Sequence, residues 1–190
     1  MNLVSNTDPI FSKELGDINI QDPQINLKET KEQMTEVMVS RRGLGLSACQ
    51  VGLDYKLFII GENKTNVMMF VNPQVLNVSE ETELDVEGCL SYPDMFVTIA
   101  RPKTVDAKWY DEEGKLQEGT FEGYTARCFL HEFDHLHGVV YKDKVSRLKW
   151  DRAEKKKRKI QKQRNSLKAA MHAAGNAMNQ IELVGKEVEG

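Results

Sequence analysis

One five-residue pattern, H-E-F-D-H at residues 131–135, constrains this chain more than any other feature of its sequence. The pattern lies within residues 123–137, where apolar residues recur at helical intervals. Four residues advance a helix by about 400°, so the two imidazoles stand one turn apart and can share one ion. Because the chain has only four histidines, we favour a metal site over a chance pairing. Glu132, beside the histidines, could reach a metal-bound water as a general base.

The identity of a third metal ligand decides what kind of site this is. Metallopeptidases with this motif take that ligand from downstream, where the available donors are His137, Asp143, Asp151 and Glu154. Upstream, residues 87–91 read E-G-C-L-S, and we expect them to form a glycine-containing turn between strands. One thiolate and two imidazoles leave a fourth position open, which suits a catalytic first-row metal. Taken alone, Cys89 would more commonly be a small buried apolar side chain.

A glycine-rich segment, residues 43–52, is the third feature with chemical meaning. Its composition is similar to that of a phosphate-binding loop, but it lacks the Lys-Ser/Thr pair and follows no predicted strand. The alternate glycines instead favour close approach of the backbone to a peptide substrate. Gln50 would then offer its side-chain amide to an oxyanion that develops during the reaction.

The periodicity of the chain predicts an α+β fold with antiparallel β-sheets around a central metal-binding helix. We expect an amphipathic helix at 27–42 and the histidine-bearing helix at 123–137. The expected strands are 56–60, 67–71, 74–78, 95–100, 104–110 and 116–121. Turns are expected where Pro, Gly, Asn and Asp cluster, at 72–73, 92–94, 101–102 and 111–114.

Charge divides the chain into two parts. Residues 142–168 hold 13 Lys+Arg against 3 Asp+Glu, whereas the remaining residues hold 13 against 26. We expect a catalytic domain at 1–147 and a long basic helix at 148–190, with an acidic end that frays. An apolar stripe along this helix comprises Ile160, Leu167, Met171, Ala174 and Met178. Such an arm is either a solvated helix or a contact for an anionic surface such as nucleic acid.

Several protein classes are disfavoured by the sequence. No stretch approaches the ~20 consecutive apolar residues of a membrane-spanning helix. The N-terminal segment contains acidic residues and has no basic flank before an apolar block, which is atypical of secretory and transit segments. Three cysteines make a disulfide framework improbable in a chain of 190 residues. We therefore expect a cytoplasmic protein without a membrane partner.

Three segments together, in this order and spacing, resemble the peptide deformylase family. The family patterns G-x-G-x-A-A-x-Q, E-G-C-L-S and H-E-x-D-H are matched by residues 43–50, 87–91 and 131–135. This sequence departs from the pattern at Ser47, where Ala is usual, and at Cys49, where Pro or Thr is common. The resemblance implies removal of the N-formyl group from formyl-methionyl nascent peptides, with release of formate.

The resemblance also assigns roles to individual residues. The implied metal ligands are Cys89, His131 and His135. Glu132 is the implied proton carrier, and the Gln50 amide with the Leu90 backbone N–H would bind the oxyanion. Implied substrate contacts are Gly43, Leu44, Gly45, Tyr124 and Arg127, the last on the helical face that borders the methionine pocket. For Glu87 and Asp134 we expect outer-shell or ion-pair roles, the alternative being solvated surface acids.

One divalent transition metal is implied, with Fe(II) as the family's natural ion and zinc, nickel or cobalt as substitutes. The basic helix is a candidate ribosome contact, because the substrate emerges from the ribosome. Two other functions remain open from the sequence. One is a zincin-like metallopeptidase with a downstream third ligand, and the other is a ribosome- or RNA-binding protein with a structural metal.

Overall fold

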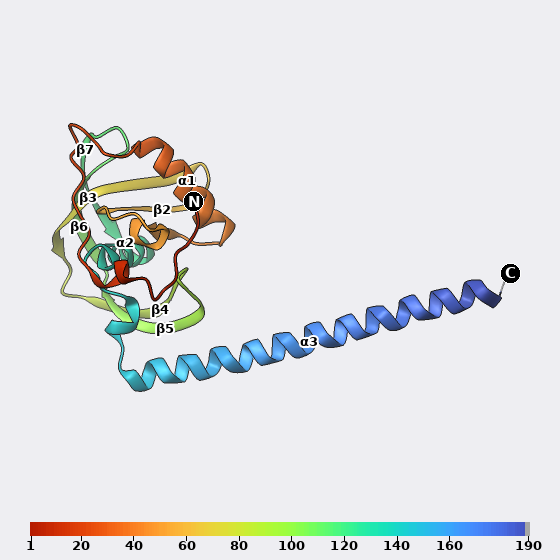
Figure 1. Ribbon diagram of the computed structural model, residues 1–190. Helices are drawn as coiled ribbons and strands as arrows, with labels where there is room; N and C mark the ends of the chain where they lie inside the picture. The colour runs from red at the N-terminus through yellow and green to blue at the C-terminus, as the bar shows by residue number, and fades with distance from the viewer. Residues whose placement is uncertain (189–190) are drawn as a thin grey trace. The chain divides into compact units, whose positions relative to one another are not determined.

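The computed structural model in Figure 1 describes the backbone of residues 1–188 and the side chains of residues 1–172. The chain divides into two compact units, Met1–Ser146 and Arg147–Gly190, which are described separately below. The first unit has the predicted α+β class and combines antiparallel strands with two α-helices. Its short 3-10 helices are η1 Pro9–Ser12, η2 Ala48–Val51 and η3 Tyr141–Lys144. Within the described residues, no helix is long and apolar enough to cross a membrane.

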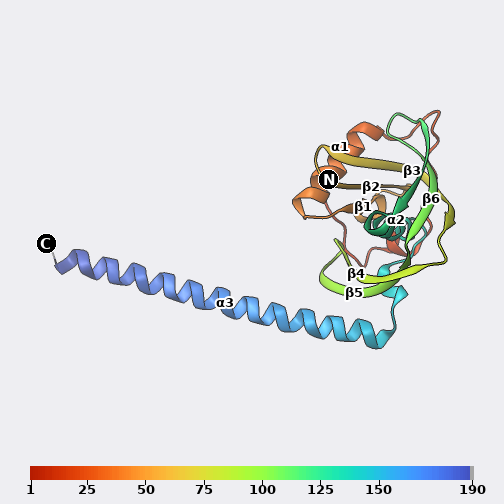
Figure 2. The ribbon, with the colours of Figure 1, turned by 180° about the vertical axis from the view of Figure 1, so that it is seen from behind.

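Five strands form one antiparallel sheet in the spatial order β1-β2-β3-β6-β7, seen from both sides in Figures 1 and 2. Their bounds are β1 Gly45–Ser47, β2 Leu57–Asn63, β3 Asn66–Val78, β6 Thr104–Tyr110 and β7 Leu116–Glu122. The hairpin between β6 and β7 turns at the predicted residues 111–114. The short strand β1 lies at the sheet edge and pairs with β2 alone. The glycine-rich segment therefore enters the fold at an edge of the sheet.

Helix α1, Leu27–Ser40, packs against one face of this sheet. The helix begins at Asn26, whose side chain accepts a hydrogen bond from the backbone N–H of Glu29. Its apolar side chains join alternate residues of β2 and β3 in a core that includes Met34, Met38, Leu57, Ile59, Met69 and Val71. Successive residues of a strand point to opposite faces of the sheet, so the intervening residues of β2 and β3 point to the other face.

Aromatic side chains on that other face hold helix α2, Gly123–Leu136. Phe58 of β2 and Phe70 of β3 are stacked, with 4.8 Å between ring centroids. Phe129 of α2 meets both rings edge-on, with centroids 5.1 Å and 5.3 Å away. One helix thus covers each face of the sheet, and the helix that carries the histidine pattern is fixed by close-packed rings.

Strands β4, Thr82–Cys89, and β5, Tyr92–Pro102, form a separate two-stranded antiparallel sheet. The sequence did not predict β4, because residues 82–86 are exposed and offer no buried apolar face. The predicted turn at 92–94 is wrong, since Tyr92 already pairs with Cys89. The register shifts there, and Asp94 adopts a positive φ of 62°.

Two other predicted turns also lie within strands. Residues 72–73 are inside β3, at an irregularity of its register with β6. Pro73 has no N–H for the ladder, and Asn72 takes a left-handed conformation with a φ of 47°. The Asn72 side chain compensates by accepting a hydrogen bond from the Ile18 N–H and donating one to the Ile18 carbonyl. Residues 101–102 complete β5 instead of turning.

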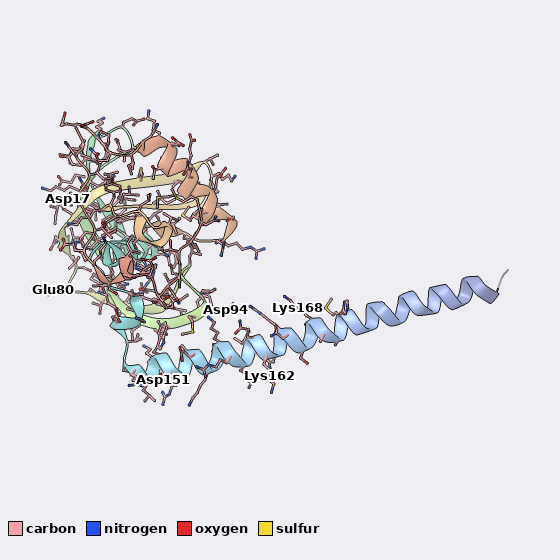
Figure 3. All side chains as sticks on the ribbon, in the orientation of Figure 1. Asp17, Glu80, Asp94, Asp151, Lys162 and Lys168 are labelled. Atoms are coloured by element: carbon pink, nitrogen blue, oxygen red, sulfur yellow. The ribbon has the colours of Figure 1, made fainter. Side chains whose placement is uncertain are left out.

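The second unit is one long helix, α3, Arg147–Val188. Figure 3 labels three of its charged side chains, Asp151, Lys162 and Lys168. In the apolar stripe, Leu167 and Met171 are exposed, whereas the side chains of Ala174 and Met178 lie outside the described residues. The acidic end is helical to Val188, and the last two residues are outside the described part.

Candidate active site

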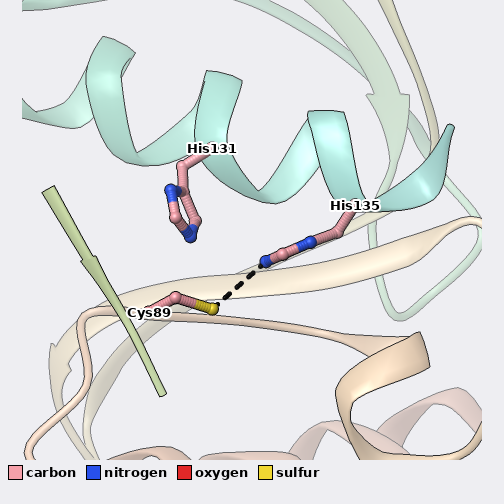
Figure 4. A group of neighbouring side chains, drawn as sticks. All are labelled: Cys89, His131 and His135. Carbon is pink, nitrogen blue, oxygen red and sulfur yellow. Dashed lines mark hydrogen bonds between the residues drawn. The ribbon is translucent and has the colours of Figure 1, made fainter. Parts of the chain in front are cut away.

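Two histidines of α2 and the cysteine at the end of β4 converge on one point. The ligand atoms of Cys89, His131 and His135 all lie within 4.8 Å of one another. Cys89 Sγ is 3.4 Å from His135 Nε2, and Figure 4 shows both imidazoles projecting from α2 toward the sulfur. Among the described residues this is the one such cluster, and none of the downstream donors joins it. The residue that joins the two histidines is therefore the upstream cysteine.

The two imidazoles of this cluster differ in their protonation preferences. Burial lowers the pKa of His135 well below its ordinary value, so its imidazole is held neutral and able to coordinate. The His135 Nδ1 atom is buried and has no hydrogen-bond partner among the described residues. Burial alone would lower the pKa of His131, but its hydrogen bonds with Cys89 and Glu87 raise it to about 10, so a metal that binds there displaces a proton. Sulfur and imidazole nitrogen are donors that first-row transition metals accept.

The carboxylate of Glu87 fixes the orientation of His131. Glu87 Oε2 lies 3.1 Å from His131 Nδ1, and its two oxygens also accept hydrogen bonds from Arg101 Nε and Nη2 at 2.8 Å and 2.9 Å. Burial alone would raise the pKa of Glu87, but these hydrogen bonds lower it to about 2. An ionised Glu87 can only accept, so His131 donates from Nδ1, and Nε2 is the nitrogen left to bind a metal once it has lost its own proton.

Asp134 completes this network. Its side chain accepts a hydrogen bond from Arg101 Nη1 at 2.5 Å and pairs with Lys144 at 3.0 Å. Both Glu87 and Asp134 therefore belong to ion-pair networks and are not solvated surface acids. Sequence reasoning missed Arg101, which it placed in a turn. A usable signal existed, because Arg101 continues the inward alternation of Met95, Val97 and Ile99 along β5.

Glu132 lies beside the two histidines and is fully enclosed. Ser47 Oγ donates a hydrogen bond to Glu132 Oε2 at 2.6 Å. Burial raises the pKa of Glu132, while the charge of His131 and the Ser47 hydrogen bond act in the opposite direction. A Cβ atom at position 45 would lie only 2.5 Å from Glu132 Oε1, so Gly45 leaves the room that the carboxylate occupies. Ser47, identified in the sequence only as a departure from a family pattern, is thus part of the site.

The Gln50 side chain is held in a fixed orientation next to the sulfur. Its Oε1 accepts a hydrogen bond from the Ser47 backbone N–H at 2.8 Å. Its Nε2 donates to Ser91 Oγ at 3.1 Å and faces Cys89 Sγ at 3.4 Å. The amide donor therefore points at the same region as the metal ligands.

A cavity of about 390 Å³ opens onto these groups. Its walls include two of the ligands, Cys89 and His131, together with Glu132. Leu90, whose backbone N–H is the expected oxyanion donor, also lines the cavity. So do all the residues expected to contact the substrate, namely Gly43, Leu44, Gly45, Tyr124 and Arg127. Gln50 and His135 are not wall residues, but Gln50 Nε2 and His135 Nε2 each lie 3.4 Å from Cys89 Sγ.

Known proteins similar to this chain agree with the geometry. A family model described as polypeptide deformylase matches residues 1–151. The chain belongs to the polypeptide deformylase family. It is a metal-dependent hydrolase that removes the N-formyl group from N-formyl-Met peptides. The two alternatives left open by the sequence, a zincin-like peptidase and an RNA-binding protein with a structural metal, are not supported.

Two deformylase relatives illustrate the similarity in sequence. The peptide deformylase of Zymomonas mobilis is 42% identical over 132 residues, covering 65% of this chain and 75% of that protein. The peptide deformylase of Thermotoga maritima is 41% identical over 139 residues, covering 73% of this chain and 83% of that protein.

Solved deformylase structures share the fold. The crystal structure of the Thermotoga maritima enzyme has a TM-score of 0.70 at 39% identity, covering 76% of this chain and 96% of that chain. The Synechococcus elongatus peptide deformylase in complex with actinonin has a TM-score of 0.74 at 34% identity, covering 82% of this chain and 84% of that chain.

Arg127 lines the cavity and is held by internal hydrogen bonds. Its side chain is buried, and Nη1 donates to Glu87 Oε1 at 2.8 Å and to the Ile99 carbonyl at 3.0 Å. Nη2 donates to the Glu83 carbonyl at 2.6 Å. Arg127 therefore does not point to solvent, and Glu87 offsets its charge inside the protein.

Proposed function

We propose that this deformylase uses Cys89, His131 and His135 as metal ligands and Glu132 as the proton carrier in the hydrolysis of the formyl amide. The observation that carries the proposal is the convergence of Cys89, His131 and His135 beside a cavity that Glu132 also lines. When bound, a divalent transition metal acts as a Lewis acid and lowers the pKa of a coordinated water toward ~7. Residues 1–147 would form the catalytic domain, and 148–190 a basic extension.

Glu132 moves the proton in this proposal. Its enclosed carboxylate takes a proton from the attacking water and gives it to the amine that leaves when the formyl C–N bond breaks. Its raised pKa supports this role, because a higher pKa makes the carboxylate a stronger base toward the attacking water. Ser47 holds the carboxylate through its 2.6 Å hydrogen bond.

The oxyanion that forms on the formyl oxygen would be bound by the Gln50 Nε2 donor and the Leu90 backbone N–H. The hydrogen bond from the Ser47 N–H to Gln50 Oε1 orients this amide before substrate arrives. Loss of one such donor typically lowers kcat about 10²- to 10³-fold. Gly43, Leu44 and Gly45 would run beside the peptide backbone, and Tyr124 and Arg127 beside the methionine side chain.

Fe(II) is the metal that we propose, with zinc, nickel or cobalt as substitutes. The thiolate and imidazole donors support a first-row transition metal but do not discriminate strongly among these ions. Metal analysis of anaerobically purified protein tests the proposal. Zinc at one equivalent, with no iron, would contradict it.

Formate release from a formyl-Met dipeptide amide by metal-loaded protein tests the catalytic assignment. We expect one formate and one free amine per turnover, and no turnover after metal removal. An unformylated, N-acetylated peptide serves as the control for peptidase action. Cleavage of its internal peptide bonds would favour the zincin-like alternative.

We also propose that the basic part of α3 contacts the ribosome, which places the enzyme in the cytoplasm beside its nascent substrates. The support is charge, because Lys155, Lys156, Lys157, Arg158 and Lys159 are all exposed or half-buried on one helix. Ribosomal RNA presents phosphates, and such contacts weaken steeply with salt because counterions are released.

Co-sedimentation with ribosomes between about 50 and 200 mM salt tests this contact. Substitution of these five residues by Gln should weaken binding and reduce its salt dependence. A matched variant with Arg at the four lysine positions keeps the charge and should bind like the wild type. Equal binding by the Gln variant and the wild type would exclude the basic segment as the contact.

A further inference from the structure

We infer that Arg41 and Arg42 form a cationic subsite at the mouth of the active-site cavity, which selects formyl peptides with acidic side chains at their third and fourth residues. The inference rests on the proposed function and adds a substrate preference to it. Both arginines line the same cavity as His131 and Glu132. Both are exposed, so their guanidinium groups are accessible to a peptide that enters from solvent.

The backbone of this arginine pair is fixed at the end of α1. The Arg42 N–H donates to the Val39 carbonyl at 3.0 Å, and the Gly43 N–H donates to the Met38 carbonyl at 2.9 Å. Arg42 adopts a positive φ of 57°, which turns the chain from the helix into the glycine-rich segment. The two cations are therefore presented at a defined place and not on a loose loop.

Neither guanidinium has an ion-pair partner among the described side chains. In the part of the chain that the structure describes, Arg41 and Arg42 make no ion pair, whereas Arg101 and Arg127 are each paired with Glu87. Asp94, the acidic residue labelled in Figure 3 that also lines the cavity, has an interaction of its own. Two positive charges at the mouth thus remain to be matched by a ligand.

The spacing along the glycine-rich segment indicates which substrate residue would reach them. Position 45 lies against the Glu132 carboxylate, where the formyl group reacts, and position 43 lies against the Leu90 side chain. From Gly45 to Arg42 the chain advances three residues, at most about 10 Å. A peptide running outward beside this segment at the same rise per residue brings its third and fourth side chains to the arginines.

Carboxylates are the groups that this subsite fits. A guanidinium binds a carboxylate through two parallel N–H donors, which makes Asp and Glu better partners than Asn or Gln. Solvent screens exposed pairs, so we expect a preference of about three- to tenfold in kcat/KM. The preference should appear mainly in KM and should shrink at high salt.

Matched peptides measure this preference directly. The series formyl-Met-Ala-Xaa-Xaa-amide, with Xaa as Asp, Asn or Lys, varies charge while it leaves the formyl-Met group unchanged. The amide end removes the terminal carboxylate that would otherwise bind the arginines itself. With the metal-loaded full-length enzyme, we expect kcat/KM to fall in the order Asp, Asn, Lys at low salt.

Variants then assign the preference to the arginine pair. In the double variant Arg41→Gln, Arg42→Gln the Asp-to-Asn ratio should fall to about one, and in Arg41→Glu, Arg42→Glu the order should reverse. The control Lys64→Gln removes one charge from the β2–β3 turn, outside the cavity, and should keep the wild-type ratio. Because each result is a ratio within one variant, a general loss of activity does not affect it.

Two results would overturn the subsite. One is equal kcat/KM for the Asp and Asn peptides with the wild-type enzyme. The other is a double variant that retains the wild-type Asp-to-Asn ratio. Either result would leave the deformylation activity itself unaffected. Absence of formate release from every peptide would overturn the proposed function itself and the subsite with it.

Discussion

The Glu87 carboxylate accepts a hydrogen bond from Nδ1 of His131 at 3.1 Å, and so sets which nitrogen of this imidazole faces the metal. We predict that Glu87→Gln weakens metal binding about 10- to 100-fold, because an amide can present either its oxygen or its NH₂ group to the histidine. Competition with a chelator of known affinity measures the change. Glu83→Gln, which changes an exposed carboxylate of the same strand, is the matched control.

Glu87 should also govern stability in acid. Its folded-state pKa of about 2 lies below the ordinary value of 4.5, so its stabilising contribution is complete above about pH 4.5 and is lost as the pH falls toward 2. Chemical denaturation of the metal-free protein over this range should show wild-type stability falling faster with acid than that of Glu87→Gln. Parallel pH curves for the two proteins would contradict the assignment.

Glu132→Gln should separate metal binding from catalysis. The residue is not a member of the ligand cluster, so we expect metal content near that of the wild type. We expect kcat to fall about 10²- to 10⁴-fold, because proton transfer is lost. Metal stoichiometry and turnover are measured on the same sample. A variant that loses its metal and regains full activity when metal is restored would refute the proton-transfer role.

Cys89→Ala should have the opposite outcome, with weak metal retention, because one of the three proposed protein ligands is removed. Cys128→Ala is a suitable control, since Cys128 also lines the cavity but is not in the ligand cluster. If iron is the resident metal, air should inactivate the iron form faster than a nickel form, because ferrous iron and its thiolate are both oxidisable. Equal half-lives in air would argue against an iron–thiolate centre.

Ser47→Ala tests how the general base is tuned. The serine hydroxyl stabilises the ionised form of Glu132, so its removal should raise the pKa of this carboxyl further. Because Glu132 must be ionised to accept a proton, the acid limb of the kcat profile should move to higher pH. Turnover near the alkaline plateau should change little. An unchanged acid limb would show that another group controls it.

Local patterns in the sequence were sufficient to predict the class of the fold and the ligand-bearing helix. The apolar alternation of residues 104–110 predicted β6, and the helical spacing near His131 predicted α2. Strand β4 was missed because its residues 82–86 are all exposed, and because the strand is formed by pairing with β5 in a two-stranded sheet. The turn expected at 72–73 does not form, because the Asn72 side chain exchanges hydrogen bonds with the backbone of Ile18, which is distant in the sequence.

The site was predictable where chemistry is encoded in short patterns and unpredictable where it depends on tertiary contacts. Cys89 and the two histidines lie in recognisable motifs, so their convergence could be anticipated. The pairing of Glu87 with both Arg101 and Arg127 could not, because no local pattern links a strand carboxylate to arginines on another strand and a helix. The Ser47 contact to Glu132 likewise joins segments 85 positions apart.

Cys89 and His135 are separated by 46 positions in the chain but by only 3.4 Å between ligand atoms. A metal bound by both residues would therefore act as a cross-link that closes this long loop and connects the β4–β5 hairpin to α2. For a permanent cross-link, loop closure of this length would stabilise the folded state by about 4 kcal/mol. A reversible metal cross-link stabilises the folded state only to the extent that the free metal concentration exceeds the dissociation constant. The concentration of free metal would then determine the free energy of unfolding of the enzyme as well as the fraction that is active.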